Sequence, residues 1–465
     1  MPIPKLTPAA NETYDTNEKP PPFGHPLKAY FAIADDYVNL NHGSYGTIPL
    51  PLIFKVNQWT YEIESNPDLF HRFTYRPLLA KSREALANLI GAEADEVVFA
   101  PNATHALNTI LRNFEWRDGD VLVGASTTYP AVANTLTYLS DRSESPRPEV
   151  ATVTLDFPLT HAQIVDIFRA KLREVKQEHP NSQFTDVPPF TPGFSEDGKG
   201  KGNKIVAVVD SIVSNPGVLL PWQEMVRVAH EEGVWTVIDA AHSVGQEPNI
   251  NLTEAKPDFW LSNAHKWLYA KRGCAVLYTP RRNQHIIKSS IPTSQQYISP
   301  KSPQWETKGT NYVGQHEWTG TQDWTSFITV PEAIAFRQWL GGEKPIYDYC
   351  HQLAIDGAKR LAEILGTRVL DESGELTTTM SNVQLPLPTK DEKPINVDIY
   401  WEVDAYLKDK LLFQRKAYAA HFYHNGAWWV RCSTQVYNEL SDFERLGKAL
   451  NEACKEVKDT ILSKY

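Results

Sequence analysis

The chain has 465 residues, of which 42% are hydrophobic and 22% charged, so it can fill a sizeable core and is not a mostly disordered protein. Its formal net charge of −10 speaks against a nucleic-acid partner, because proteins that bind phosphate backbones carry a basic excess. No apolar run approaches the roughly 18 residues that a membrane helix needs, and the four scattered cysteines form no Cys-x-x-Cys motif typical of a zinc ribbon. The polar, proline-rich beginning lacks an apolar signal core, so we expect a cytoplasmic enzyme without a membrane partner.

The first predicted element is an N-terminal arm over residues 1–50, followed by one or two helices over residues 55–89, where apolar residues recur at helical spacing. Short apolar runs then alternate with amphipathic segments. The predicted strands cover residues 97–100, 121–123, 151–155, 205–210, 234–239, 259–262 and 274–278, and the predicted helices cover 104–114, 131–139, 159–178 and 222–232. Strands buried on both faces that alternate with helices are typical of a covered, mostly parallel sheet.

The pattern changes in the second half of the chain. Residues 185–204 mix proline, glycine and lysine and predict a surface insertion, and residues 296–317 predict an irregular segment. Beyond Pro331, two long helices (332–340 and 346–365) precede isolated strands. We therefore expect a large domain over residues 51–330 and a smaller α+β domain over residues 331–465.

The sharpest chemical signal is Ser262-Asn-Ala-His-Lys266-Trp267, directly after an apolar strand. A lysine at a strand end can form a Schiff base with an aldehyde when it is desolvated and has a cationic neighbour. A solvated loop lysine is the alternative for this hexapeptide alone.

A second apolar strand ends in Asp239, and His242 follows three residues later. A pyridine-based cofactor needs a carboxylate at its ring nitrogen, because only the protonated ring withdraws electrons strongly, and His242 is placed to donate to the phenolic oxygen of such a ring. The alternative for Asp239 is a helix N-cap.

A third signal is Pro101-Asn102-Ala-Thr104-His-Ala106, between a strand and an amphipathic helix. Small and hydroxyl residues at a helix N-terminus expose backbone N–H groups to a positive dipole end, which is a seat for phosphate. A plain capping role for Asn102 is the alternative, and Thr321 after Gly320 offers a further donor. No Gly-x-x-x-x-Gly-Lys-Ser/Thr motif occurs, which disfavours a nucleoside triphosphate.

A phosphate seat, a strand-end carboxylate and a lysine in this order point to pyridoxal 5′-phosphate (PLP). From about residue 38 to residue 446 the chain resembles the class V aminotransferase family of fold type I, which includes cysteine desulfurases and isopenicillin N epimerase. The motifs that carry the resemblance are Asn39-Leu-Asn-His-Gly43-Ser44-Tyr-Gly46, Asn102-Ala-Thr104, Thr128-Tyr129-Pro-Ala-Val132, Ser211-Ile-Val-Ser214-Asn-Pro-Gly217, Asp239-Ala-Ala-His242, His265-Lys266-Trp267, Gly320-Thr321 and Val430-Arg431-Cys-Ser433. The resemblance implies a large α/β domain, with a mostly parallel seven-stranded sheet covered by helices, and a smaller α+β C-terminal domain.

The resemblance also implies the cofactor contacts. Lys266 would form the Schiff base, Asp239 would pair with the pyridinium, and His242 would face the ring oxygen. The phosphate would be held by Ala103, Thr104 and His265, with Thr321 reaching in from a partner subunit. The implied assembly is a homodimer with shared active sites.

Other candidate residues concern the substrate. Tyr129 falls where the family places the ring that stacks on the cofactor, although many relatives carry histidine there; a loop aromatic is the alternative. Arg431 lies in an apolar strand, where a buried guanidinium needs either a substrate carboxylate or an internal salt bridge. Asn41 and His42 would approach the substrate from the arm and Arg72 would reach the neighbouring subunit's site, with ordinary surface or interface roles as the alternatives.

Two further patterns narrow the chemistry. His421 and His424 lack a sensibly spaced third ligand, so we expect no metal. Residues 412–430, the loop before Arg431, contain no cysteine, whereas desulfurases carry a mobile cysteine there. A persulfide-relay desulfurase is therefore disfavoured.

In layout the chain resembles fungal members of the family, namely hercynylcysteine sulfoxide lyase and the pyridoxal enzymes of loline-type pathways. The leading prediction is a lyase that deprotonates Cα of a cysteine-derived substrate and eliminates its sulfur group. A specialised-metabolism enzyme that forms C–C or C–N bonds, as in a Mannich-type cyclisation, is the alternative, followed by an epimerase or aminotransferase. A cofactor-free binding protein on the same fold is disfavoured, because it would not use Lys266.

Overall fold

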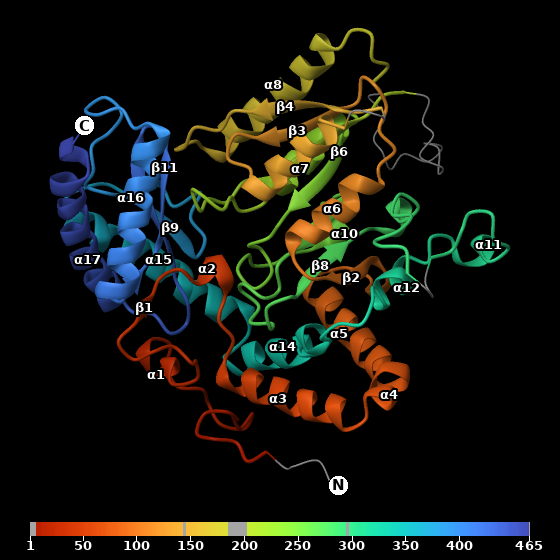
Figure 1. Ribbon diagram of the computed structural model, residues 1–465, viewed down its shortest axis with the longest axis horizontal. Helices are drawn as coiled ribbons and strands as arrows, with labels where there is room; N and C mark the ends of the chain where they lie inside the picture. Colours follow the sequence, from red (N-terminus) through yellow and green to blue (C-terminus); the bar gives the residue numbers. More distant parts are fainter. Residues whose placement is uncertain (1–5, 143–145, 185–201, 294–296, 465) are drawn as a thin grey trace.

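The computed structural model describes residues 6–142, 146–184, 202–293 and 297–464. Figure 1 shows a central sheet with helices around it and, at the left, a second group of elements that contains the C-terminal helices. The surface insertion expected at residues 185–204 lies almost entirely outside the described residues. Within the described residues, no helix is long and apolar enough to cross a membrane.

The central sheet has seven strands in the order β2-β8-β7-β6-β5-β3-β4. The strands are β2 (Val97–Ala100), β3 (Val121–Ala125), β4 (Glu149–Val153), β5 (Ile205–Asp210), β6 (Trp235–Asp239), β7 (Phe259–Ser262) and β8 (Ala275–Tyr278). All pairs from β7 to β4 are parallel, and only β8 runs antiparallel to its two neighbours. This confirms the predicted mostly parallel sheet.

Helices cover both faces of this sheet, because successive strand residues are apolar on both sides. One core contains β-strand residues such as Val209 and Ile238 together with helices α5 (Tyr75–Ile90), α8 (His161–Glu178) and α9 (Trp222–Glu231). The other contains Val208 and Val237 together with α6 (Ala103–Asn113) and α7 (Pro130–Ser140). The sheet is therefore the middle layer of three.

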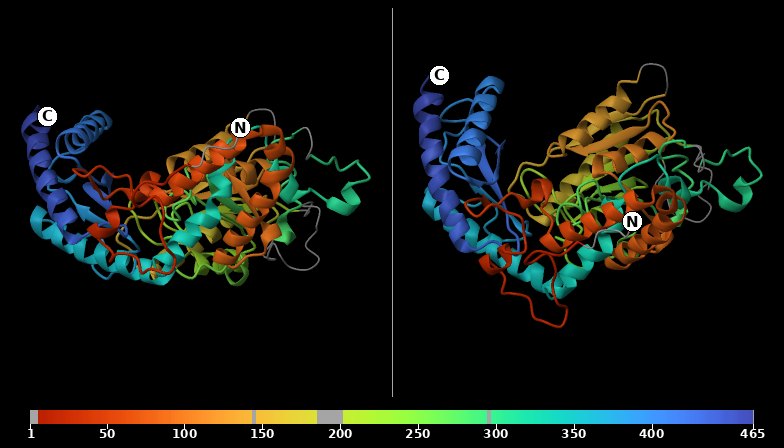
Figure 2. Two further views of the ribbon diagram at one scale, coloured as in Figure 1. Left: turned by 90° about the horizontal axis from the view of Figure 1, so that it is seen from below. Right: turned by 60° about the horizontal axis from the view of Figure 1, so that its bottom comes forward.

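The N-terminal segment runs beneath the sheet and reaches the C-terminal elements (Figures 1 and 2). Its elements are α1 (His25–Lys28), β1 (Val38–Asn39), α2 (His42–Tyr45), α3 (Leu50–Ser65), α4 (Pro67–Leu69) and a π-helical turn at Phe70–Thr74 before α5. Strand β1 pairs in parallel with β10 (Ala417–Tyr418), and the N–H of Gly24 donates to the carbonyl of Val436 at 2.7 Å. The arm is thus held by the far end of the chain.

The C-terminal elements form a second sheet and a second core. Antiparallel strands β9 (Met380–Gln384), β11 (Ala420–His424) and β12 (Ala427–Ser433) lie in the order β11-β12-β9. They pack against α15 (Glu343–Leu365), α16 (Val397–Asp409) and α17 (Leu440–Thr460). Helix α14 (Val330–Trp339) precedes α15 in the chain, and a π-helical turn at Lys410–Gln414 follows α16.

The prediction of an irregular segment at residues 296–317 is wrong in part. Two short helices, α11 (Trp305–Lys308) and α12 (Tyr312–Glu317), occupy its second half, and α10 (Leu252–Ala255) and α13 (Thr325–Ile328) are comparably short. Helix α11 begins two residues after Pro303 and ends at Lys308, directly before Gly309, whose φ is 53°. Proline and glycine limit the length of helices here without abolishing them.

Candidate active site

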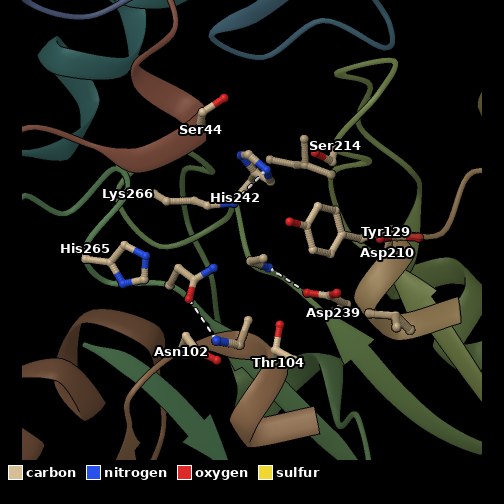
Figure 3. A pocket seen from close by; sticks show the side chains of 15 residues that line it. Ser44, Asn102, Thr104, Tyr129, Asp210, Ser214, Asp239, His242, His265 and Lys266 are labelled. Carbon is tan, nitrogen blue, oxygen red and sulfur yellow. Dashed lines mark hydrogen bonds between the residues drawn. The ribbon is translucent and has the colours of Figure 1, made fainter. Parts of the chain in front are cut away.

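A pocket opens at the carboxyl ends of the parallel strands, where the loops after β2, β3, β5, β6 and β7 converge. Ligands bind at this edge in open α/β sheets. Figure 3 shows its side chains pointing toward a common space. The residues that line the pocket are Ser44, Asn102, Ala103, Thr104, Tyr129, Val132, Asp210, Ile212, Ser214, Asp239, Ala241, His242, Asn263, His265 and Lys266.

Lys266 lies in the loop after β7, and its Nζ is 3.0 Å from Nε2 of His242 (Figure 3). Desolvation in the pocket and the positive charge of Arg431 lower its pKa to about 7, although the nearby Asp239 carboxylate opposes the shift. A large fraction of the amine is therefore neutral near pH 7, which is the form that attacks a carbonyl carbon. The alternative of a solvated loop lysine is wrong for this structure.

Asp239 is the last residue of β6, and its carboxylate Oδ1 accepts a hydrogen bond from the N–H of Ala241 at 3.1 Å. The residues that follow form a turn and not a helix, so the N-cap alternative does not apply. Burial raises the pKa of Asp239, while the Ala241 N–H and the charge of Lys266 act in the opposite direction. A cation bound beside this buried carboxylate would be strongly stabilised.

Asp210 is a second carboxylate at the same edge, and sequence reasoning did not single it out. It ends β5 and pairs in register with Asp239, so the two side chains lie on the same face of neighbouring strands. Burial and the charge of Asp239 raise the pKa of Asp210 well above its usual value. The signal was present in the sequence, because Asp210 closes an apolar strand just as Asp239 does.

His242 is buried between Lys266 and an indole ring. The Nε1–H of Trp267 donates to Nδ1 of His242 at 3.3 Å. Burial, followed by the charges of Lys266 and Arg431, holds the pKa of His242 well below its usual range. The imidazole is therefore neutral in this structure.

The predicted phosphate seat lies at the N-terminus of α6. Asn102 caps the helix, with its side-chain oxygen accepting from the N–H of His105 at 2.9 Å. The N–H of Ala103 donates to Oδ1 of Asn263 at 2.9 Å, whereas among the described residues none accepts from the N–H of Thr104. The amide of Asn263 thus lies beside the N–H of Thr104. The sequence analysis did not single out Asn263, although it belongs to the hexapeptide that contains Lys266.

His265 also lines the pocket, and its Nδ1 donates to the carbonyl of Cys274 at 2.8 Å. Burial lowers the pKa of His265 to about 4. The Nε2 atom is then the ring nitrogen left for another partner.

Arg431 is buried in β12, next to the pocket and not among its lining residues. Its Nη1 donates to the carbonyl of Ser214 at 2.7 Å, and its Nη2 donates to Oγ of Ser44 at 2.9 Å and to Oδ1 of Asn41 at 3.1 Å. Burial lowers the pKa of Arg431 to about 10. Over the described part of the chain no carboxylate pairs with this guanidinium, so the internal salt bridge is not found.

The structure brings Tyr129 into the pocket with its ring facing Asp239 and Ser214 (Figure 3). His42 instead lies behind the pocket, because its ring nitrogens contact the carbonyl of Lys266 at 2.8 Å and the hydroxyl of Tyr437 at 3.0 Å. Thr321 and Arg72 are exposed outside the pocket, and Arg72 pairs with Asp68 at 2.9 Å. Asn41 contacts Arg431 and is not a lining residue.

The two histidines weighed as a metal pair have other partners. His421 contacts the carboxylate of Asp404 at 3.0 Å, and Nε2 of His424 accepts from the N–H of Phe157 at 3.1 Å. Among the described residues there is no group of three or more side chains able to hold a metal ion.

The donors of the pocket fit PLP. The free N–H and hydroxyl of Thr104 and the Asn263 amide offer donors for a phosphate at one end. The buried carboxylate of Asp239 suits the ring nitrogen of PLP, and the neutral imidazole of His242 suits the phenolic oxygen. The Lys266 amine, with a pKa of about 7, suits the aldehyde carbon.

The chain is similar to several known proteins. The family model for aminotransferase class-V matches residues 60–168 and 198–390. The L-cysteine desulfhydrase-like protein lolT1 of Epichloe uncinata is 32% identical over 95% of this chain and 98% of that protein. The hercynylcysteine sulfoxide lyase of Schizosaccharomyces pombe is 30% identical over 93% and 98%, respectively. A cysteine desulfurase from Thermococcus onnurineus NA1, solved in its apo form, is 16% identical and superposes with a TM-score of 0.69 over 94% of this chain and 100% of that one.

Proposed function

Since the chain belongs to the aminotransferase class-V family and uses PLP, we propose that it is a C–S lyase acting on a cysteine conjugate or its sulfoxide. It removes the Cα proton and eliminates the sulfur group at Cβ. The position of the cysteines favours a lyase over a desulfurase that transfers sulfur to its own thiol. All four cysteines are buried, and none lines the pocket: Cys274, Cys350, Cys432 and Cys454. A sulfur atom that leaves the substrate in the pocket therefore meets no cysteine thiol that could accept it.

Thr104, Asn263 and His265 would hold the PLP phosphate, assisted by Ala103. Asp239 would face the ring nitrogen, and His242 the phenolic oxygen. When bound, PLP supplies an electron sink that stabilises negative charge at Cα of an amino acid.

Lys266 and Arg431 act on different groups of the amino acid, the Cα proton and the carboxylate. The Lys266 amine, with a pKa of about 7, takes the Cα proton at Nζ, because a base works best when its pKa is near the operating pH. Arg431 holds the substrate carboxylate by exchanging its contacts with Ser44 and Asn41 for two parallel hydrogen bonds.

Tyr129 serves the leaving group. Its hydroxyl lies on the pocket side of the loop before α7, and the ring is half-exposed. The C–S bond breaks with its electron pair on sulfur, and the Tyr129 hydroxyl donates the proton that the sulfur takes up. The three-carbon enamine that is released hydrolyses to pyruvate and ammonia.

The proposal extends to assembly, domains and location. We place Thr321 and Arg72 in the partner subunit's site of a homodimer, which their exposed positions allow. The seven-stranded and the three-stranded sheets, which are separate, support a division into an arm (1–50), a large domain (51–330) and a small domain (331–465). The cytoplasm is the proposed location.

The reaction is tested by incubating the purified protein with cysteine conjugates and their sulfoxides, and by measuring pyruvate, ammonia and the released sulfur compound. We expect all three in equal amounts, and none from a Lys266→Ala variant. A variant with all four cysteines replaced by serine or alanine is expected to keep its turnover if it folds. Absence of pyruvate from every such substrate, or ring closure with an amino acid that lacks a leaving group, would favour the bond-forming alternative.

The role of Tyr129 is tested by Tyr129→Phe. The variant should bind PLP and substrate as the wild type does and release the sulfur product much more slowly, since only the proton donor is lost. Tyr138→Phe, an exposed tyrosine on α7 outside the pocket, is the matched control. Equal rates for both variants would contradict the assignment.

A further inference from the structure

The buried ring of Trp267 makes a contact that the proposed function does not use. Its indole Nε1 lies 3.3 Å from Nδ1 of His242. An indole N–H can only donate a hydrogen bond, so Nδ1 of His242 is the acceptor in this pair. Because a neutral imidazole carries one proton, that proton is on Nε2.

Nε2 of His242 faces the pocket, where it lies 3.0 Å from Nζ of Lys266 (Figure 3). With its proton on this atom, His242 donates to the neutral amine. The same N–H would donate to an anionic oxygen that came within reach of it. The opposite tautomer would present a lone pair and repel that oxygen.

The indole is held firmly in place. Trp267 is 1% exposed, packs with Ile212 and Met380, and has its ring centroid 5.3 Å from that of His42. A Cβ added to Gly43 would lie only 2.9 Å from the indole, so α2 closes over the ring. The donor therefore has a fixed direction toward His242.

We infer that Trp267 is a positioning residue that fixes the proton of His242 on Nε2, so that the imidazole presents a hydrogen-bond donor to the phenolic oxygen of PLP. The effect on PLP rests on the proposed function, whereas the tautomer itself does not. Burial is the main cause of the low pKa of His242 and keeps the imidazole neutral, and the positive charge of Arg431 acts in the same direction.

The first measurement is the tautomer. The full chain is labelled with ¹⁵N-histidine, with and without PLP, and the His242 signals are assigned by their loss in His242→Gln. We expect the shifts of an Nε2-protonated ring in the wild type. In Trp267→Phe, or with a benzothiophene analogue of tryptophan that keeps the ring shape and lacks the N–H, a share of Nδ1-protonated ring should appear.

The second measurement is the dissociation constant of PLP, followed by the visible absorbance of the bound cofactor. Removing the indole N–H should weaken binding about two- to tenfold, the range of one hydrogen bond. Trp260→Phe is the matched control, because Trp260 is fully buried and its Nε1 has no hydrogen-bond partner among the described residues. It should leave the dissociation constant unchanged.

A double-mutant cycle separates positioning from packing. In a His242→Gln background the amide can donate without help from the indole, so Trp267→Phe should no longer weaken PLP binding. A wild-type ring protonated on Nδ1, or an undiminished Trp267→Phe effect in that background, would overturn the inference. Failure of the wild type to bind PLP would instead refute the proposed function and leave the tautomer measurement valid.

Discussion

Asp239 is the residue whose charge the proposed chemistry uses most directly. We predict that Asp239→Asn lowers turnover about ten- to a hundredfold, because a hydrogen bond to a charged partner contributes roughly 1.5–3 kcal/mol. PLP should still bind through the phosphate seat. The measurement compares turnover and PLP content of the folded variant with those of the wild type, and wild-type turnover would refute the role.

Arg431 offers a second test on a single side chain. Arg431→Lys should raise KM for the amino acid about tenfold or more, because an ammonium cannot reproduce the paired hydrogen bonds of a guanidinium. The wild type should prefer an amino acid over its carboxamide much more strongly than the variant does. Arg360→Lys on the surface of α15 is the control. An unchanged preference in Arg431→Lys would show that the carboxylate binds elsewhere.

Single residues differ in how far the sequence could predict their place. Lys266 and Thr104 follow strands, and Asp239 ends one, at the sheet edge where the loops converge. Their positions after predicted strands were therefore enough to predict that they meet in one pocket. His42 could not be placed in this way, because its contacts with Lys266 and Tyr437 depend on how the arm packs across the molecule. Asn263 was overlooked for another reason: its partner Ala103 lies far away in the chain.

Among the elements, α6 links stability to ligand binding through its cap. We predict that Asn102→Ala lowers the free energy of unfolding by about 1 kcal/mol, the usual effect of a lost N-cap. The variant should also bind PLP more weakly, since the first turn that presents the Thr104 N–H would fray. Urea unfolding and PLP titration measure the two effects.

Asn396→Ala is the matched control for that prediction. Asn396 caps α16, far from the pocket, by accepting from the N–H of Ile399 at 2.9 Å. It should show the same loss of stability with unchanged PLP affinity. Equal PLP affinity for Asn102→Ala and the wild type would remove α6 from the phosphate seat.

Elements were predictable where burial is uniform. Strands β2, β5 and β7 have the predicted bounds because each is an apolar run buried on both faces. Helices α11 and α12 were not predicted, since four- to six-residue helices between prolines and glycines show no period. Their positions are decided by contacts such as that of Tyr312 with the core behind the sheet.

For the whole molecule, the proposed homodimer makes a prediction about mixtures. Lys266→Ala and a Thr321 variant with weak phosphate binding should each be inactive alone. Mixed after partial unfolding and refolding, they should recover part of the activity, because a hybrid dimer contains one site with both residues intact. A fully active monomer in solution would contradict shared sites.

Arg431, near the C-terminal end of the chain, donates hydrogen bonds to Asn41 and Ser44 in the N-terminal arm. Recognition of the substrate carboxylate therefore depends on contact between these two segments. The residues that this chain is proposed to supply to PLP in its own site come from one continuous stretch around the large sheet, whereas the guanidinium comes from the small sheet and its partners come from the arm. A chain cleaved between the two sheets would keep the lysine and lose its selectivity for amino acids. The elements around the large sheet are therefore enough to position this chain's PLP-binding residues, whereas recognition of the substrate carboxylate also needs the arm and the small sheet.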